Sequence, residues 1–206
     1  MTTGARRFFR RPILLAAVGI LVVMLTACTG RGGGYLPPSV DGVAFTGPAS
    51  FGFDFSCEDK GGVNPPTGQL DIELAYTDHG TSVLLGSPFS IHGIVDEIDP
   101  VLESAICIGQ NPPPDGSTLI FLGRYRLLSS PPAGFPTSCP PRETPKTPLC
   151  RFEVIVRDND LNREPSPGDF FSIKLSSATV PDDELDPATV FYARAGLLEG
   201  GNLIVD

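Results

Sequence analysis

The chain has 206 residues and a net charge of −9, with 15 Lys and Arg against 24 Asp and Glu. This acidic balance repels phosphate backbones, so we expect no nucleic-acid partner. With 22 Pro, 23 Gly and no Trp, the composition disfavours long helices and favours strands joined by loops.

The first 27 residues have the pattern of an export signal. Four arginines and no acidic residue precede an apolar run over 13–24. Because positive charge stays cytoplasmic while an apolar run enters the bilayer, this order predicts a signal peptide over residues 1–27. An uncleaved transmembrane helix is the alternative, for which the run is short. Without this segment 11 basic and 24 acidic residues remain, a net charge of −13, so the exported body should be repelled by anionic headgroups.

The apolar run is followed by Leu25-Thr26-Ala27-Cys28. This resembles the lipobox of bacterial lipoproteins, and the pair Arg6-Arg7 resembles a twin-arginine export signal. The lipobox resemblance implies that Cys28 receives a diacylglyceryl group, that the signal is removed, and that an acyl chain such as palmitate is added to the new amino terminus. Two or more chains give stable anchoring. The protein is then expected on the extracytoplasmic side of the cell membrane, and Thr29 after the cysteine implies the outer membrane in a two-membrane cell.

Residues 28–42 are expected to be the lipidated cysteine and a tether. Glycines at 30 and 32–34 make such a segment flexible, and Pro37-Pro38 stiffens its end. The folded domain is accordingly expected over residues 43–206.

Four further cysteines are Cys57, Cys107, Cys139 and Cys150. In an exported domain an even number predicts two disulfides, and four cysteines allow three pairings. We favour Cys139–Cys150, which would close a Pro-rich loop, together with Cys57–Cys107. The sequence has no Cys-x-x-Cys pair and no suitable Cys-His spacing, so a zinc site is not expected.

Short apolar alternations with a period of two predict strands through most of residues 43–206. They occur at 49–56, 69–76, 89–95, 105–108, 118–127, 151–157, 170–176, 190–195 and 202–205. Eight to ten strands with one apolar face each require two packed layers or a closed barrel. We predict an all-β fold, a β-sandwich of antiparallel strands with long Pro-rich loops and no helix.

Four segments in this order resemble a class of small β domains in secreted bacterial proteins, often found beside choice-of-anchor modules. The segments are 49–55, 68–80, the strand-loop-strand 152–175, and 198–205. The extra cysteines and the Pro-rich inserts depart from that class. The resemblance implies a fold and brings no established activity with it.

The polar loop at 158–169 is a candidate calcium site. Its oxygen-bearing residues are Asp158, Asp160, Asn162, Glu164 and Asp169. Ca²⁺ takes six to eight oxygen ligands, which such spacing can supply. Arg163 stands where an EF-hand needs glycine, and a solvated polar turn is the alternative.

No motif for catalysis stands out. Ser50 lies in Pro48-Ala-Ser-Phe-Gly52, which lacks the first glycine of a nucleophile elbow. His79 follows Asp78 in a predicted turn, and His92 lies in a predicted strand. We therefore expect a non-catalytic, surface-exposed binding or structural module of the cell envelope, with an envelope protein or a glycan as partner. The alternatives are an envelope hydrolase and a calcium-dependent adhesion module.

Overall fold

The fold is taken from a computed structural model of the chain. The structure describes residues 28–40, 42, 44–59, 68–82, 85–94, 118–139, 150–159, 168–179 and 185–205. The predicted signal peptide, Cys107 and the strand expected at 105–108 lie outside these residues.

The described residues form nine strands and one short 3-10 helix. These are β1 (Cys28–Leu36), β2 (Ala49–Asp59), β3 (Gly68–Asp78), β4 (Phe89–Ile94), β5 (Thr118–Leu127), β6 (Cys150–Arg157), β7 (Phe170–Ser176), η1 (Pro187–Thr189), β8 (Val190–Leu197) and β9 (Gly200–Val205). The predicted all-β, antiparallel class is confirmed. The strand count of eight to ten is also met.

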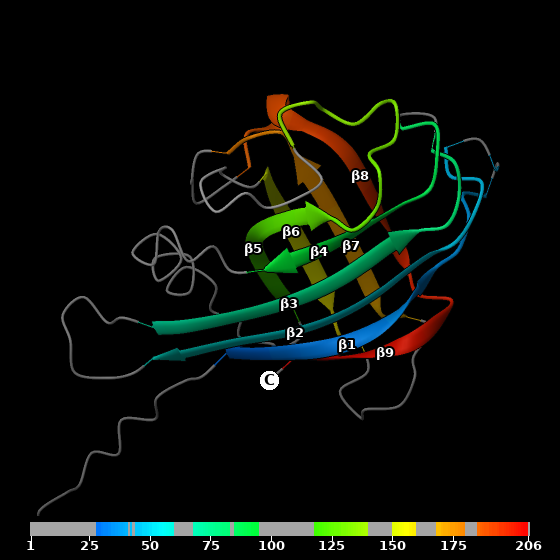
Figure 1. The fold of residues 1–206 in the computed structure, drawn as a ribbon. Coiled ribbons are helices and arrows are strands. Elements are labelled where there is room, and N and C mark those ends of the chain that lie inside the picture. Colours follow the sequence, from blue (N-terminus) through cyan, green and yellow to red (C-terminus); the bar gives the residue numbers. More distant parts are fainter. Residues whose placement is uncertain are drawn as a thin grey trace, which may run out of the picture.

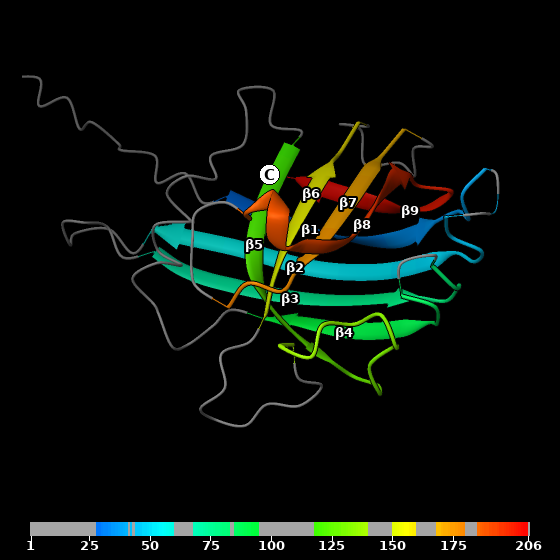
Figure 2. The ribbon, with the colours of Figure 1, turned by 90° about the horizontal axis from the view of Figure 1, so that it is seen from above.

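All nine strands belong to one antiparallel sheet in the order β8-β7-β6-β5-β4-β3-β2-β1-β9. Figures 1 and 2 show that the sheet curls, so that β9 and β1–β4 form one layer and β5–β8 the other, with strands that cross at a steep angle. The expected packing of two layers is present, and one continuous sheet provides both. The end strands β8 and β9 are consecutive in the chain, so the curl brings the two edges toward each other.

Aromatic rings fill the space between the layers. The alternation in β2 places Phe51, Phe53 and Phe55 on the buried face. Phe51 stacks on Phe171 of β7 with 3.7 Å between ring centroids. The rings of Phe53 and Phe55 lie 5.5 and 5.2 Å from that of Phe121 in β5. Burial of such rings is the main stabilising contribution to this core.

The tether expected at 28–42 is wrong for residues 28–36, which form β1 between β2 and β9. Every second residue from 30 to 34 is a glycine opposite a core phenylalanine. The register partners are Gly30 and Phe55, Gly32 and Phe53, and Gly34 and Phe51. A Cβ at 32 would lie 2.9 Å from Leu203 Cδ2, and one at 34 would lie 3.1 Å from Leu198 Cδ1. The backbone oxygens of Asn202 and Gly200 would lie closer still, at 2.4 and 2.5 Å from these two Cβ positions. The glycines are therefore required by the close approach of β9, and the folded domain includes residues 28–36.

The turn from one layer into the other depends on two glycines beneath one ring. The Phe152 ring lies 2.6 Å from the position of a Cβ at Gly93 in β4 and 2.7 Å from one at Gly123 in β5. Phe152 is fully buried. Side chains at either glycine would displace the ring, so these residues allow β4 and β5 to pair at the bend.

A disulfide joins Cys139 to Cys150, with 5.5 Å between the Cα atoms. This pair is the one favoured from the sequence. Both cysteines are buried, and Phe135 in the same loop packs edge-on against Phe191 of β8 with 4.9 Å between centroids. Residues 128–139 of the Pro-rich loop are thereby held against the end of the core. The expected Cys57–Cys107 pair includes a residue outside the described part.

Candidate functional site

The interior holds a polar network that the sequence patterns did not reveal. Arg194 Nη1 donates to Asp78 Oδ1 at 3.0 Å, and both side chains are at most 2% exposed. The Tyr192 hydroxyl donates to Asp78 Oδ2 at 2.6 Å and lies 2.5 Å from the Tyr76 hydroxyl. Burial of an ion pair is tolerated only when the remaining polar atoms are also satisfied.

The remaining polar atoms of Arg194 form hydrogen bonds outside the ion pair. Its Nη2 donates to the carbonyl oxygens of Pro37 and Gly47, each at 2.8 Å. The guanidinium carbon lies 4.5 Å from the centroid of the Phe45 ring. Asp78 Oδ1 also accepts from the Gly80 backbone N–H at 3.0 Å. The network joins β3, β8 and the segment before β2, which gives it a structural role.

The tyrosines of this network stay protonated over a wide pH range. Burial is the main cause that raises the pKa of Tyr76 above its usual value of 10.0. Burial, followed by the charges of Tyr76 and Asp78, raises the pKa of Tyr192 further. A protonated hydroxyl is what the Tyr192 hydrogen bond to a carboxylate requires.

Two of the residues expected to bind calcium, Asp158 and Asp169, are described, and both are buried. Asp169 Oδ1 accepts from the Asn159 backbone N–H and Oδ2 from the Leu203 backbone N–H, each at 3.1 Å. Asp169 therefore links the end of β6 to β9. Asp160, Asn162 and Glu164 lie outside the described residues, so the calcium site stays a prediction. No group of three His, Cys, Asp or Glu suited to a metal is found in the part of the chain that the structure describes.

A serine and a histidine meet on the outer surface of the β1–β4 layer. Ser50 Oγ lies 2.8 Å from His79 Nε2, and the pair is exposed. The carboxylate next in the chain, Asp78, is engaged with Arg194 in the interior. For the alternative of an envelope hydrolase, a serine and a histidine thus lie in contact, while the nearest acid in sequence has another role.

The second histidine is fixed through both ring nitrogens. Arg126 Nη2 lies 3.0 Å from His92 Nδ1, and Glu73 Oε2 lies 3.2 Å from Nε2. A guanidinium can only donate, so Nδ1 accepts and Nε2 carries the hydrogen that Glu73 accepts. This arrangement leaves neither nitrogen available as a base.

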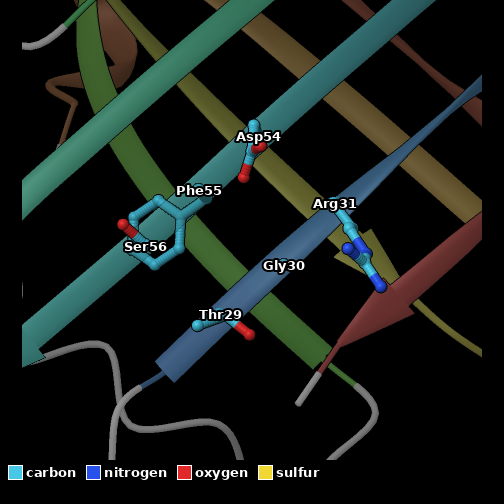
Figure 3. A pocket seen from close by; sticks show the side chains of 6 residues that line it. All are labelled: Thr29, Gly30, Arg31, Asp54, Phe55 and Ser56. Atoms are coloured by element: carbon cyan, nitrogen blue, oxygen red, sulfur yellow. The ribbon is translucent and has the colours of Figure 1, made fainter.

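A hollow of about 290 Å³ lies near the start of β1 (Figure 3). It is lined by Thr29, Gly30, Arg31, Asp54, Phe55 and Ser56. In Figure 3 the Arg31 side chain extends from β1 toward β9, while Asp54 projects from β2. The hollow offers one cation, one carboxylate and two hydroxyls, and its volume is at the small end of ligand sites.

Three further hydroxyl groups lie on the same side of the sheet, toward the other end of β2. Ser50, Thr77 and Ser90 are register neighbours on β2, β3 and β4. Thr77 Oγ1 and Ser90 Oγ are 2.9 Å apart. We call the outward side of β1–β4, with these residues, Arg31 and Asp54, the hydroxyl face.

Comparisons of the chain with protein families, with curated proteins and with solved structures find no match. Across the described ranges, no helix has the length and apolar character needed to cross a bilayer.

Proposed function

We propose that the protein is a lipid-anchored, non-catalytic module of the cell envelope that binds a polar partner, a glycan or an envelope protein, through its hydroxyl face. The position of Cys28 is the observation that supports the lipid anchor. It ends the lipobox-like Leu25–Cys28 segment and is also the first residue of β1. Cleavage before Cys28 would leave the sheet intact.

Two further observations favour an exported body that is attached through its lipid. The Cys139–Cys150 disulfide is typical of oxidising compartments. Residues 28–206 carry a net charge of −13, which disfavours adhesion to anionic lipid through the protein surface. The lipid chains are then the attachment.

The hydroxyl face supports a polar ligand because its groups can donate and accept hydrogen bonds at fixed spacings. Ser50, Thr77 and Ser90 stand on neighbouring strands of one sheet, a more rigid support than a loop. The exposed Tyr35 ring on β1 adds an apolar contact at the same level as Ser50. Such a mixture suits a sugar chain or a polar protein surface better than a hydrophobic ligand.

The anchor is tested with the Cys28→Ala variant of the full chain, expressed in a bacterium that processes lipoproteins. We expect the parent to be mature, acylated by mass and retained on membranes after a high-salt wash. The variant should keep its leader and carry no acyl mass. Cys57→Ser is the matched control and should behave as the parent. An unprocessed parent, or a variant indistinguishable from it, would overturn the anchor.

The binding surface is tested by photo-crosslinking in whole cells. A benzophenone amino acid is placed at Ser56, beside the hollow, and in a second variant at Ala195 on the outer side of β8. We expect a discrete adduct from position 56 alone. Equal adducts from both positions, or none from position 56, would contradict the proposed surface.

A serine hydrolase is the second candidate, since Ser50 and His79 form an exposed pair 2.8 Å apart. A fluorophosphonate probe should label the purified chain at Ser50 if this pair is a nucleophile and its base. Ser50→Ala is the matched control. Labelling that Ser50→Ala abolishes would replace the non-catalytic proposal.

A further inference from the structure

Two cysteines stand opposite each other at the open end of the first hairpin. Cys28 begins β1, and its register partner in β2 is Cys57. The pairs that follow along β1 and β2 are continuous from this position to Leu36 and Ala49. The juxtaposition is therefore set by a ladder of nine antiparallel residue pairs.

This register position is compatible with a disulfide. Directly opposite residues of antiparallel strands have Cα atoms about 4.5–5.5 Å apart, and disulfides form at about 4.4–6.8 Å. Cys139 and Cys150, which are bonded, have a Cα separation of 5.5 Å.

We propose that Cys28 and Cys57 form a cross-strand disulfide whenever the chain folds without a lipid on Cys28. Each thiol loses one proton, the two sulfurs bond, and two electrons pass to a disulfide oxidant, which is reduced to two thiols. In an oxidising compartment the oxidant is a thiol-disulfide oxidoreductase, and in the test it is glutathione disulfide.

The diacylglyceryl thioether and this disulfide exclude each other because both consume the Cys28 sulfur. The lipid must therefore be attached before β1 pairs with β2. In the lipidated chain Cys57 is left for Cys107, the partner favoured from the sequence. The state of Cys28 thus decides the partner of Cys57.

The sequence makes the test direct. Trypsin separates all five cysteines onto different peptides, by cleavage after Arg31, Lys60, Arg124, Arg126, Arg142, Lys146 and Arg151. The full chain is produced in a reducing cytoplasm in detergent-soluble form, so that Cys28 keeps its thiol. After its β-sheet circular dichroism is verified, it is oxidised with glutathione disulfide, alkylated, and digested without reduction.

We expect a peptide that links Cys28 to Cys57, with loss of alkylation at both, and alkylated Cys107. Cys107→Ser should leave that linked peptide unchanged. Oxidation in guanidinium chloride above the unfolding transition is the control, since without the register the link should spread over the available cysteines. A folded parent that links Cys57 to Cys107 and leaves Cys28 alkylated would overturn the proposal.

This result is independent of whether the cell lipidates Cys28, because the tested chain carries no lipid. Failure of the disulfide and failure of the anchor are therefore distinguishable. The membrane-extracted chain provides the second arm, in which a Cys28 that carries the diacylglyceryl thioether should accompany a Cys57–Cys107 peptide. A Cys28–Cys57 peptide there would show that attachment of this lipid does not precede pairing and would overturn the proposed order.

Discussion

Removal of the Asp78 carboxylate should be among the most destabilising single changes in this protein. In Asp78→Ala, Arg194 keeps its buried charge without a counterion. The Tyr192 hydroxyl and the Gly80 N–H lose the acceptors they have at 2.6 and 3.0 Å. Few of these groups can turn to water, because the network is enclosed by the core.

The magnitude is dominated by the unpaired charge. Breaking a buried ion pair by removing one partner costs about 3–5 kcal/mol. A stranded neutral donor costs about 1–3 kcal/mol, and this cost overlaps with the first because the same carboxylate serves all three donors. We expect a loss of about 4–5 kcal/mol, a large part of the roughly 5–15 kcal/mol by which domains are stable.

Two further variants separate charge from shape. Asp78→Asn keeps the size and one acceptor oxygen, so it should cost less than Asp78→Ala. Replacing both partners, as Asp78→Leu with Arg194→Met, removes the pair and its desolvation cost together. The double variant should lose less stability than the sum of its two single variants, since contacting residues are coupled.

The assay is urea unfolding with the disulfide intact, followed by far-UV circular dichroism at pH 7. The midpoint and the slope give the free energy of unfolding for each variant. A loss under about 1 kcal/mol in Asp78→Ala, or strict additivity in the double variant, would refute the reasoning from the buried pair.

Three other consequences can be measured. Burial is the largest cause that raises the pKa values of three tyrosines, which are Tyr76, Tyr125 and Tyr192. A raised pKa means that the folded state holds the tyrosine proton more tightly, so its contribution to stability is complete below about pH 10 and is lost as the pH rises above it. Above that pH the free energy of unfolding should fall by roughly 1.4 kcal/mol per pH unit for each tyrosine. In urea titrations at alkaline pH, tyrosine-to-phenylalanine variants should show a smaller fall of this free energy with pH. Gly32→Ala should lower the free energy of unfolding by about 1–3 kcal/mol through overpacking, because its Cβ would lie 2.9 Å from Leu203. Gly52→Ala is the control, since its Cβ meets nothing closer than 3.9 Å. Equal melting temperatures for the two variants would contradict the packing of β1. Asp169→Asn should speed hydrogen exchange at the Leu203 amide by roughly 10-fold or more, since loss of a charged acceptor costs about 1.5–3 kcal/mol. An unchanged exchange rate would show that Asp169 Oδ2 does not hold β9.

The strands with strict alternation could be predicted from the sequence. Large apolar residues alternate in β2, β3, β6 and β7, and those within 51–55, 72–76, 152–156 and 171–175 are buried. The pairing of Cys139 with Cys150 followed from the loop they enclose. These features are local, so neighbouring residues carry the information.

The segment that forms β1 could not be recognised in this way. Gly-Arg-Gly-Gly-Gly at 30–34 has the composition of a flexible linker. Its inward glycines are required by groups far along the chain: a Cβ at Gly30 would meet Leu119 of β5, and one at Gly32 or Gly34 would meet the backbone of β9. Composition alone does not show that a distant strand requires a missing side chain.

The buried network had one local signal. Tyr192 and Arg194 share a face in the strand 190–197, and that face points inward. A cation two residues from a buried tyrosine implies an internal acid. The identity of the acid was hidden, because Asp78 stands in a Thr-Asp-His-Gly segment typical of an exposed turn.

Two of the buried acids, Asp78 and Asp169, act where the backbone ladder is interrupted. The end strands of the curled sheet, β8 and β9, are consecutive in the chain, yet each pairs with a strand on one side only. Backbone groups along such a seam need other partners. Asp169, before β7, accepts the Leu203 N–H of β9, and Asp78 holds Arg194 of β8, which binds the carbonyls of Pro37 and Gly47 after β1. Side chains thus replace the missing strand-to-strand hydrogen bonds and fasten β8 and β9 to the layer that begins at Cys28.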